Sequence, residues 1–195
     1  MLELAALGAK VMQSRSIEFG MKYGLKLHVL SSFTFNEGTY IVKEIPNMEK
    51  VLVNGVTSNK KEAKITILDL PDKPGMASKI FGALAEKSIN VDMIIQSATR
   101  GGESNDISFT VSRDDMKKAV QTTELIAKSL GAGKVSFHDK IAKVSIVGAG
   151  MQSHPGVAAD MFKTLADNNI NIEMISTSEI KVSCIIEEKF ADLAV

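Results

Sequence analysis

The chain reads Asp72-Lys73-Pro74-Gly75-Met76-Ala77 and, 81 residues later, Ser153-His154-Pro155-Gly156-Val157-Ala158. The likeness runs on without a gap beyond each of these stretches. Between residues 74 and 93, nine positions are identical in the two copies, namely 74, 75, 77, 81, 84, 85, 89, 90 and 93 with their counterparts 81 residues further on. A repeat of this length indicates that one structural unit occurs twice in the chain.

Each copy is predicted to combine strands and helices in the same order. The elements of the first copy are a strand, a helix, two strands, a helix and a strand, at 64–70, 76–87, 91–96, 107–111, 114–130 and 134–138. On the first helix Ala77, Ile80 and Leu84 recur at helical spacing and make one apolar face. The order βαββαβ is that of the ferredoxin-like fold. We therefore expect an α+β protein built from two ferredoxin-like domains in tandem.

The second copy is incomplete at its C-terminal side. Its predicted strands and helix lie at 143–147, 157–168, 172–176 and 181–186, and a second helix begins at 187. The strand predicted at 51–58, followed by a hairpin turn at 58–62, is the candidate to supply the missing fourth strand and close the sheet edge. This arrangement predicts two interleaved domains, the first at 63–139 and the second at 48–62 plus 140–195.

The segment before the repeat is predicted to form a helix at 2–23, which Gly24 ends, and short extended pieces at 27–30 and 40–42. A segment of about 45 residues is too short to bury a core of its own. We expect it to pack against the rest of the chain, a partner, or sequence outside this chain.

Composition argues against several kinds of function. Lys plus Arg equals Asp plus Glu at 23 each, so no net charge recruits nucleic acid or an anionic membrane. No apolar run approaches the roughly 20 residues that span a bilayer, and the N-terminus lacks the pattern of a signal peptide, which predicts a cytoplasmic protein. The single cysteine, Cys184, lies in an apolar run and is predicted to be a buried thiol. No metal-ligand spacing and no nucleophile–base pair is found, so we predict no catalytic and no metal-binding residue.

Each Pro-Gly pair lies at a predicted turn from a strand into a helix. Glycine lets the backbone approach a ligand closely, and the first helical turn presents free N–H groups that suit a carboxylate. Asp72 could pair with an ammonium, and Asn171-Ile172-Glu173 would offer polar groups beside the second loop. The pattern favours a pocket for a free amino acid. The alternative is that Pro-Gly only shapes a turn and the asparagine only starts a strand.

Repeats with this loop, and with Asn-Ile or Asn-Val opening the next strand, resemble ACT domains, the amino-acid-sensing modules of biosynthetic enzymes. Three strings are similar to the regulatory region of the aspartate kinase family: Val53-Asn54-Gly55-Val56, Asn90-Val91-Asp92-Met93-Ile94-Ile95-Gln96 and Ile175-Ser176-Thr177-Ser178-Glu179-Ile180. Residues 1–12, 15–19 and 31–33 resemble the end of the kinase domain of that family. The resemblance implies that 1–47 is a helical remnant of the kinase domain.

The resemblance also implies a function. The chain would be a regulatory subunit or fragment that binds lysine, threonine or both where ACT domains meet, and so inhibits the ATP-dependent phosphorylation of aspartate by a catalytic subunit. Carried over by position, the effector-binding residues are Asp72, Gly75, Met76, Ala77, Gln96, Thr99, Met151, Ser153, His154, Gly156, Val157, Asn171, Ile172, Glu173, Ser178 and Glu179. Gln96 would bind a threonine hydroxyl, and Glu173 or Glu179 a lysine ammonium. Glu179 could instead be a solvated charge at a hairpin.

The implied partners are a second copy, through the ACT domains, and a catalytic aspartate kinase subunit. ATP and magnesium would belong to that subunit, because the nucleotide- and aspartate-binding parts are absent here; the chain itself is expected to need no cofactor. Two alternatives stay open. One is a stand-alone amino-acid-binding ACT protein without a kinase partner. The other is a small enzyme on the same scaffold, such as a phosphatase, for which only His154 is available in the loops.

Overall fold

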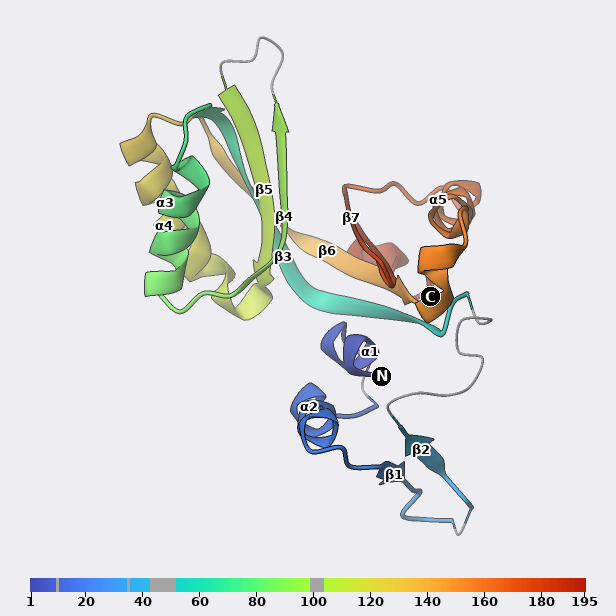
Figure 1. The fold of residues 1–195 in the computed structure, drawn as a ribbon. Helices are drawn as coiled ribbons and strands as arrows, with labels where there is room; N and C mark the ends of the chain where they lie inside the picture. The colour runs from blue at the N-terminus through green and yellow to red at the C-terminus, as the bar shows by residue number, and fades with distance from the viewer. Residues whose placement is uncertain (10, 35, 43–51, 99–103) are drawn as a thin grey trace. The chain divides into compact units, whose positions relative to one another are not determined.

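The computed structural model describes residues 1–9, 11–34, 36–42, 52–98 and 104–195. The chain divides into two compact units, which we name unit 1 (Met1–Asn59, Lys143–Ile185 and Phe190–Val195) and unit 2 (Lys60–Ala142 and Ile186–Lys189). Both are seen in Figure 1, where the colour follows the sequence. The predicted domain boundaries at 47/48, 62/63 and 139/140 stay predictions.

Unit 2 is a sheet with two helices on one face. Its strands are hydrogen-bonded in the order β4-β5-β3-β6, with β5 antiparallel to both β4 and β3. Helices α3 and α4 lie together on one side of these strands (Figure 1). The elements are β3 (Gly55–Pro71), α3 (Met76–Glu86), β4 (Val91–Ala98), β5 (Ser104–Ser112), the short 3-10 helix η2 (Arg113–Asp115), α4 (Met116–Leu130) and β6 (Val135–Val147).

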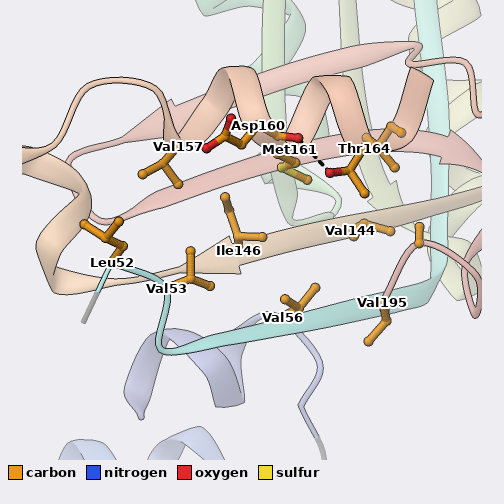
Figure 2. A pocket seen from close by; sticks show the side chains of 12 residues that line it. Leu52, Val53, Val56, Val144, Ile146, Val157, Asp160, Met161, Thr164 and Val195 are labelled. Atoms are coloured by element: carbon orange, nitrogen blue, oxygen red, sulfur yellow. Dashed lines mark hydrogen bonds between the residues drawn. The ribbon is translucent and has the colours of Figure 1, made fainter. Parts of the chain in front are cut away.

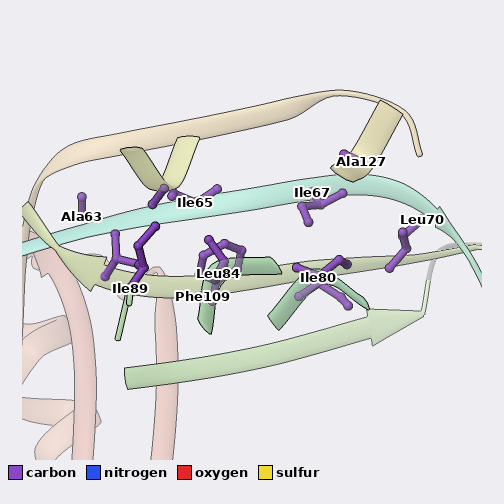
Figure 3. Close-up of a cluster of buried hydrophobic side chains, with 12 residues drawn as sticks. Ala63, Ile65, Ile67, Leu70, Ile80, Leu84, Ile89, Phe109 and Ala127 are labelled. Carbon is purple, nitrogen blue, oxygen red and sulfur yellow. The ribbon is translucent and has the colours of Figure 1, made fainter. Parts of the chain in front are cut away.

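The core of unit 2 lies between the sheet and the two helices. Alternate residues of β3, such as Ile65 and Ile67, point to the helices, since side chains of a strand alternate between its faces. They meet Ile80 and Leu84 of α3, which are fully buried (Figure 3). Phe109 of β5 is also buried in this cluster. Burial of each large apolar side chain stabilises the fold by about 1.5–3 kcal/mol relative to exposure in water.

Unit 1 repeats this plan with one long helix. Its strands are hydrogen-bonded in the order β3-β6-β8-β7, and β7 and β8 form an antiparallel hairpin. The backbone N–H of Asn54 donates to Val147 O at 2.7 Å, and the buried hydroxyls of Ser145 and Ser183 lie 2.7 Å apart between β6 and β8. The further elements are η3 (Ala149–Ser153), α5 (Val157–Asp167), β7 (Met174–Ser178), β8 (Lys181–Glu187) and η4 (Glu188–Phe190), of which Ile186–Lys189 belong to unit 2.

The α+β class and the repeated ferredoxin-like order are confirmed. The single helix predicted at 2–23 is wrong. It is broken into α1 (Leu2–Ala6) and α2 (Ser14–Lys22), because Gly8 adopts a left-handed φ of +106° that ends α1. A Cβ at Gly8 would also lie only 3.1 Å from Ser58 O. Beyond α2, β1 (Leu27–Val29) and β2 (Thr39–Ile41) form a two-stranded antiparallel sheet.

The hairpin turn predicted at 58–62 is wrong. β3 runs through it as one strand of 17 residues, and Glu62 pairs with Ser112 of β5. The separate strands predicted at 134–138 and 143–147 are likewise parts of the single strand β6 of 13 residues. Neither junction contains Gly or Pro, the residues that interrupt a strand most strongly. The helix predicted from 187 is only the short 3-10 turn η4.

Cys184 is a buried free thiol on β8, as predicted. Burial raises the pKa of the Cys184 thiol from 9.0 to about 11. The unfolded chain therefore releases this proton near pH 9 while the folded chain retains it, so the thiol should make the fold less stable as pH rises from 9 toward 11. We expect the free energy of unfolding of the wild type, minus that of a Cys184→Ala variant, to decrease over this range in urea titrations. If the difference in unfolding free energy between the two proteins did not change with pH, the raised pKa of Cys184 would be contradicted.

Candidate functional site

The described part of unit 2 has a pocket of about 320 Å³ at the first Pro-Gly loop. We name it the Pro-Gly pocket. It lies where the end of β3, the loop into α3 and the adjoining parts of β4 and β5 meet. Its lining residues are Leu70, Pro71, Asp72, Lys73, Pro74, Gly75, Met76, Ala77, Gln96, Asn105 and Ile107.

The loop into α3 depends on a left-handed glycine. Gly75 is the N-cap of α3 with φ 90°, and a Cβ there would meet nothing within 4 Å. Its backbone conformation, rather than lack of space, is therefore what requires glycine. The Lys79 N–H donates to Gly75 O at 3.1 Å, which starts the helical hydrogen bonding. The N–H groups of the first turn, such as that of Ala77, have no acceptor within the helix and are directed to its N-terminal end.

Asp72 is fixed by a residue of β5. Asn105 Nδ2 donates to Asp72 Oδ1 at 2.8 Å, and Asn105 is 7% exposed. Gln96 reaches the pocket from β4, where it pairs with Ile107 of β5. The pocket thus holds a carboxylate, an amide and the N-terminus of a helix, which together can bind an ammonium, a hydroxyl and a carboxylate. Asp72, Gly75 and Gln96 are exposed, so the pocket is open on one side of unit 2.

The structure brings together most of the site residues predicted for the first repeat. Asp72, Gly75, Met76, Ala77 and Gln96 all line the Pro-Gly pocket. Thr99 lies outside the described residues. Sequence reasoning missed Asn105, because this residue lies between the strands predicted at 91–96 and 107–111, whereas β5 begins at Ser104. Its alternation with Ile107, which puts both side chains on one face of the strand, was the available signal.

Of the residues predicted for the second repeat, Val157 alone lines the pocket in unit 1 described below, and none lines the Pro-Gly pocket. Gly156 caps α5 with φ 109°, and His154 Nδ1 donates to Gly150 O at 2.9 Å. The Gly148 N–H donates to Ile180 O at 2.9 Å, which puts the turn that carries Ser178 and Glu179 beside the start of this loop. Met151 and Ser153 lie in η3.

The expectation that Asn171, Ile172 and Glu173 lie beside the second loop is wrong within unit 1. They follow the C-terminus of α5, whereas the loop enters its N-terminus. A helix of 11 residues separates these ends by roughly 16 Å. The Glu173 N–H donates to Ile185 O at 2.8 Å, so its backbone belongs to the β7–β8 pairing.

A second pocket of about 330 Å³ lies in unit 1 beside α5 (Figure 2). Of the predicted site residues only Val157 lines it, and its polar groups are few. Thr164 Oγ1 already donates to Asp160 O at 2.8 Å. It does not suit a zwitterion, because most of its wall is apolar. Its lining residues are Leu52, Val53, Val56, Val144, Ile146, Val157, Asp160, Met161, Thr164, Leu165, Ala194 and Val195.

Metal and membrane functions find no support in the described residues. Within those ranges no three His, Cys, Asp or Glu side chains are grouped as metal ligands would be. Among the helices that the structure describes, none combines the length and apolar character needed to cross a bilayer.

Two ferredoxin-like repeats, each with a helix entered through Pro and a left-handed Gly, define a tandem ACT-type regulator. A sequence model of the ACT domain family matches residues 68–124 and 144–195. The aspartate kinase of Pseudomonas putida is 50% identical over 196 residues, which is 100% of this chain and 47% of that protein. The chain thus spans about half the length of the curated relatives it matches.

Solved structures agree with this assignment. The ligand-free regulatory subunit of aspartate kinase from Thermus thermophilus is 42% identical with a TM-score of 0.69, covering 74% of this chain and 94% of that one. A chain from a crystal structure of aspartokinase alpha and beta subunits is 49% identical with a TM-score of 0.68, covering 73% and 93%. The chain belongs to the ACT-domain regulatory regions of the aspartate kinase family, which confirms the resemblance found in the sequence.

Proposed function

We propose that the chain binds lysine, threonine or both as feedback effectors and thereby inhibits the ATP-dependent phosphorylation of aspartate by a catalytic aspartate kinase subunit. The observation that carries this proposal is the Pro-Gly pocket, in which Asp72, Gln96 and the N-terminus of α3 surround one space of about 320 Å³. A small amino acid offers complementary groups to each of them.

The chemistry of the pocket supports a zwitterionic ligand. The α-carboxylate would accept hydrogen bonds from the first-turn N–H groups of α3, where the helix dipole also favours an anion. The α-ammonium would donate to Asp72, and a threonine hydroxyl would bond to the Gln96 amide. In the second repeat, Glu173 or Glu179 is the proposed partner of a lysine ammonium.

The open side of the Pro-Gly pocket leaves room for a second ACT domain to contact a bound effector. Asp72 and Gln96 are exposed in unit 2, so a ligand bound there would keep one face uncovered. We propose that an ACT domain of a second copy covers that face in a homodimer, and that the effector binds this arrangement more tightly than the active one. Such differential affinity is the only way a ligand can shift the equilibrium. ATP and magnesium belong to the catalytic partner, and the cytoplasm stays the predicted compartment.

Calorimetric titration of the purified chain tests the proposal. We expect saturable heat with threonine or lysine and none with methionine, which has neither a hydroxyl nor a second ammonium. Absence of heat with threonine and lysine, singly and together, would refute effector binding. Co-purification with a catalytic chain that carries the kinase motifs separates the proposal from a stand-alone amino-acid-binding protein.

Replacement of Gln96 by alanine should weaken threonine binding about tenfold and lysine binding less, because a hydrogen bond contributes about 0.5–1.5 kcal/mol and only threonine offers the hydroxyl. The measurement is the dissociation constant for each amino acid. Gln121→Ala is the matched control, since Gln121 is exposed on α4 and does not line the pocket. A larger loss for lysine than for threonine would overturn the role given to Gln96.

A further inference from the structure

We infer that Asn105 is a positioning residue of the Pro-Gly pocket, which fixes the Asp72 carboxylate in the orientation that receives a ligand ammonium. The inference rests on the proposed binding of an amino acid in this pocket. It adds a residue that lies 33 positions away from Asp72 in the sequence and belongs to a different element.

The first observation is the hydrogen bond between the two side chains. Asn105 Nδ2 donates to Asp72 Oδ1 at 2.8 Å. An ionised carboxylate can only accept hydrogen bonds, so the amide must present its NH₂ group to Asp72, and its orientation is fixed. One oxygen of Asp72 is thereby occupied. The other oxygen, Oδ2, remains to accept from an ammonium.

The second observation is that Asn105 is buried on a strand whereas Asp72 is exposed on a loop. Asn105 is 7% exposed and lies in β5, where it pairs with Leu70 of β3 and Ala98 of β4. Asp72 is exposed in the loop after β3. A buried side chain on a central strand that holds an exposed side chain on a loop will determine where the loop side chain points.

A third observation concerns the strand that leads into the loop. The register of β3 against β5 shifts between Ile67 and Leu70, and Asp69 adopts a positive φ of 53° there. The Asp69 N–H donates to Asp106 Oδ1 at 2.9 Å. Bulges of this kind redirect the chain that follows them. Two consecutive residues of β5 therefore hold this corner, with Asp106 on the bulge and Asn105 on Asp72.

Two variants test the inference. Asn105→Ala removes the donor, and Asn105→Asp puts a second carboxylate against Asp72 at nearly the same volume. We expect either change to weaken threonine binding about tenfold at pH 7, because Asp72 loses its fixed orientation. Gln121→Glu is the matched control for the change from amide to carboxylate, since Gln121 is exposed on α4 and does not line the pocket. The Gln121→Glu protein should bind threonine as tightly as the wild type.

The pH dependence separates positioning from a merely structural role. Two carboxylates at one site raise the pKa of one of them, and a protonated carboxyl is again a donor. The affinity of Asn105→Asp relative to the wild type should therefore recover as pH is lowered from 7 to 5. Lys73, Asp69 and Asp106 also carry charge at this corner, but they are the same in both proteins and cancel in the comparison.

The possible outcomes distinguish the two proposals. If the wild type binds no amino acid, the proposed function fails and this inference fails with it. If the wild type binds and both Asn105 variants bind equally well, only the positioning role is overturned. A loss in Asn105→Asp that does not recover at pH 5, together with a lowered melting temperature, would also overturn it in favour of a structural role.

Discussion

Replacement of Asp72 by asparagine is expected to lower the affinity of the Pro-Gly pocket for threonine by about thirtyfold. The change keeps the shape of the side chain and removes its charge. A hydrogen bond to a charged group contributes about 1.5–3 kcal/mol, and a loss of about 2 kcal/mol corresponds to this factor. Asp72 is the only carboxylate that lines the described pocket, so no other described lining residue replaces it for an ammonium.

The deaminated analogue of threonine makes this prediction specific. That hydroxy acid keeps the carboxylate and the hydroxyl and lacks the ammonium. It should bind Asp72→Asn no more weakly than it binds the wild type. Asp114→Asn is the matched control, because Asp114 is exposed in η2 and does not line the pocket. Equal threonine affinities of Asp72→Asn and the wild type, at unchanged melting temperature, would remove Asp72 from the site.

Most of the site in the first repeat could be predicted from the sequence, because residues close together in the sequence form it. Pro74 and Gly75 mark the turn, and the following apolar spacing marks the helix whose N-terminus faces the pocket. Asn105 was not accessible in this way. It reaches Asp72 only through the register of β5 against β3, which is displaced by the bulge between Ile67 and Leu70. Such a pairing depends on contacts between distant parts of the chain.

The errors about the strands have a common physical origin. At 58–62 the sequence is polar, which predicts a turn, and at 139–142 the order of elements in the two repeats predicts the end of one strand and the start of another. In a sheet, however, a strand continues wherever its backbone groups find partners on neighbouring strands, whatever its side chains. Glu62 pairs with Ser112 in this way, and it is 5% exposed despite its charge. Local polarity is therefore a weaker signal for a turn than the presence of Gly or Pro.

Replacement of Gly148 by alanine should destabilise unit 1 by about 3 kcal/mol, the upper part of the usual cost of overpacking. Gly148 follows β6 with φ −167°, an extended conformation that any residue adopts, so its backbone is not strained. The obstacle is space. A Cβ there would lie 1.8 Å from Leu52 O and 2.9 Å from Val53 Cα. Both are backbone atoms, so no side chain can rotate away to make room.

The neighbouring hydrogen bonds make this backbone hard to displace. Gly148 N–H donates to Ile180 O at 2.9 Å, and Asn54 N–H donates to Val147 O at 2.7 Å. Asn54 Oδ1 also accepts from the Ala149 N–H at 3.1 Å. A methyl group at 148 must break at least part of this set to enter. Because the same segment begins the loop that carries His154, we expect the change to disturb that loop as well.

Urea unfolding measures the loss of stability, and amide hydrogen exchange locates it. We expect backbone amides to lose protection from exchange in unit 1 and to keep it in unit 2. Gly82→Ala is the matched control, because Gly82 lies within α3, where a Cβ would meet nothing within 4 Å. Alanine is the better helix former, so this control should be about 0.5–1 kcal/mol more stable than the wild type. The same added methyl group should therefore lower the free energy of unfolding at position 148 and raise it at position 82. A Gly148→Ala protein as stable as the wild type would show that residues 52–54 do not lie against β6 as the structure has them.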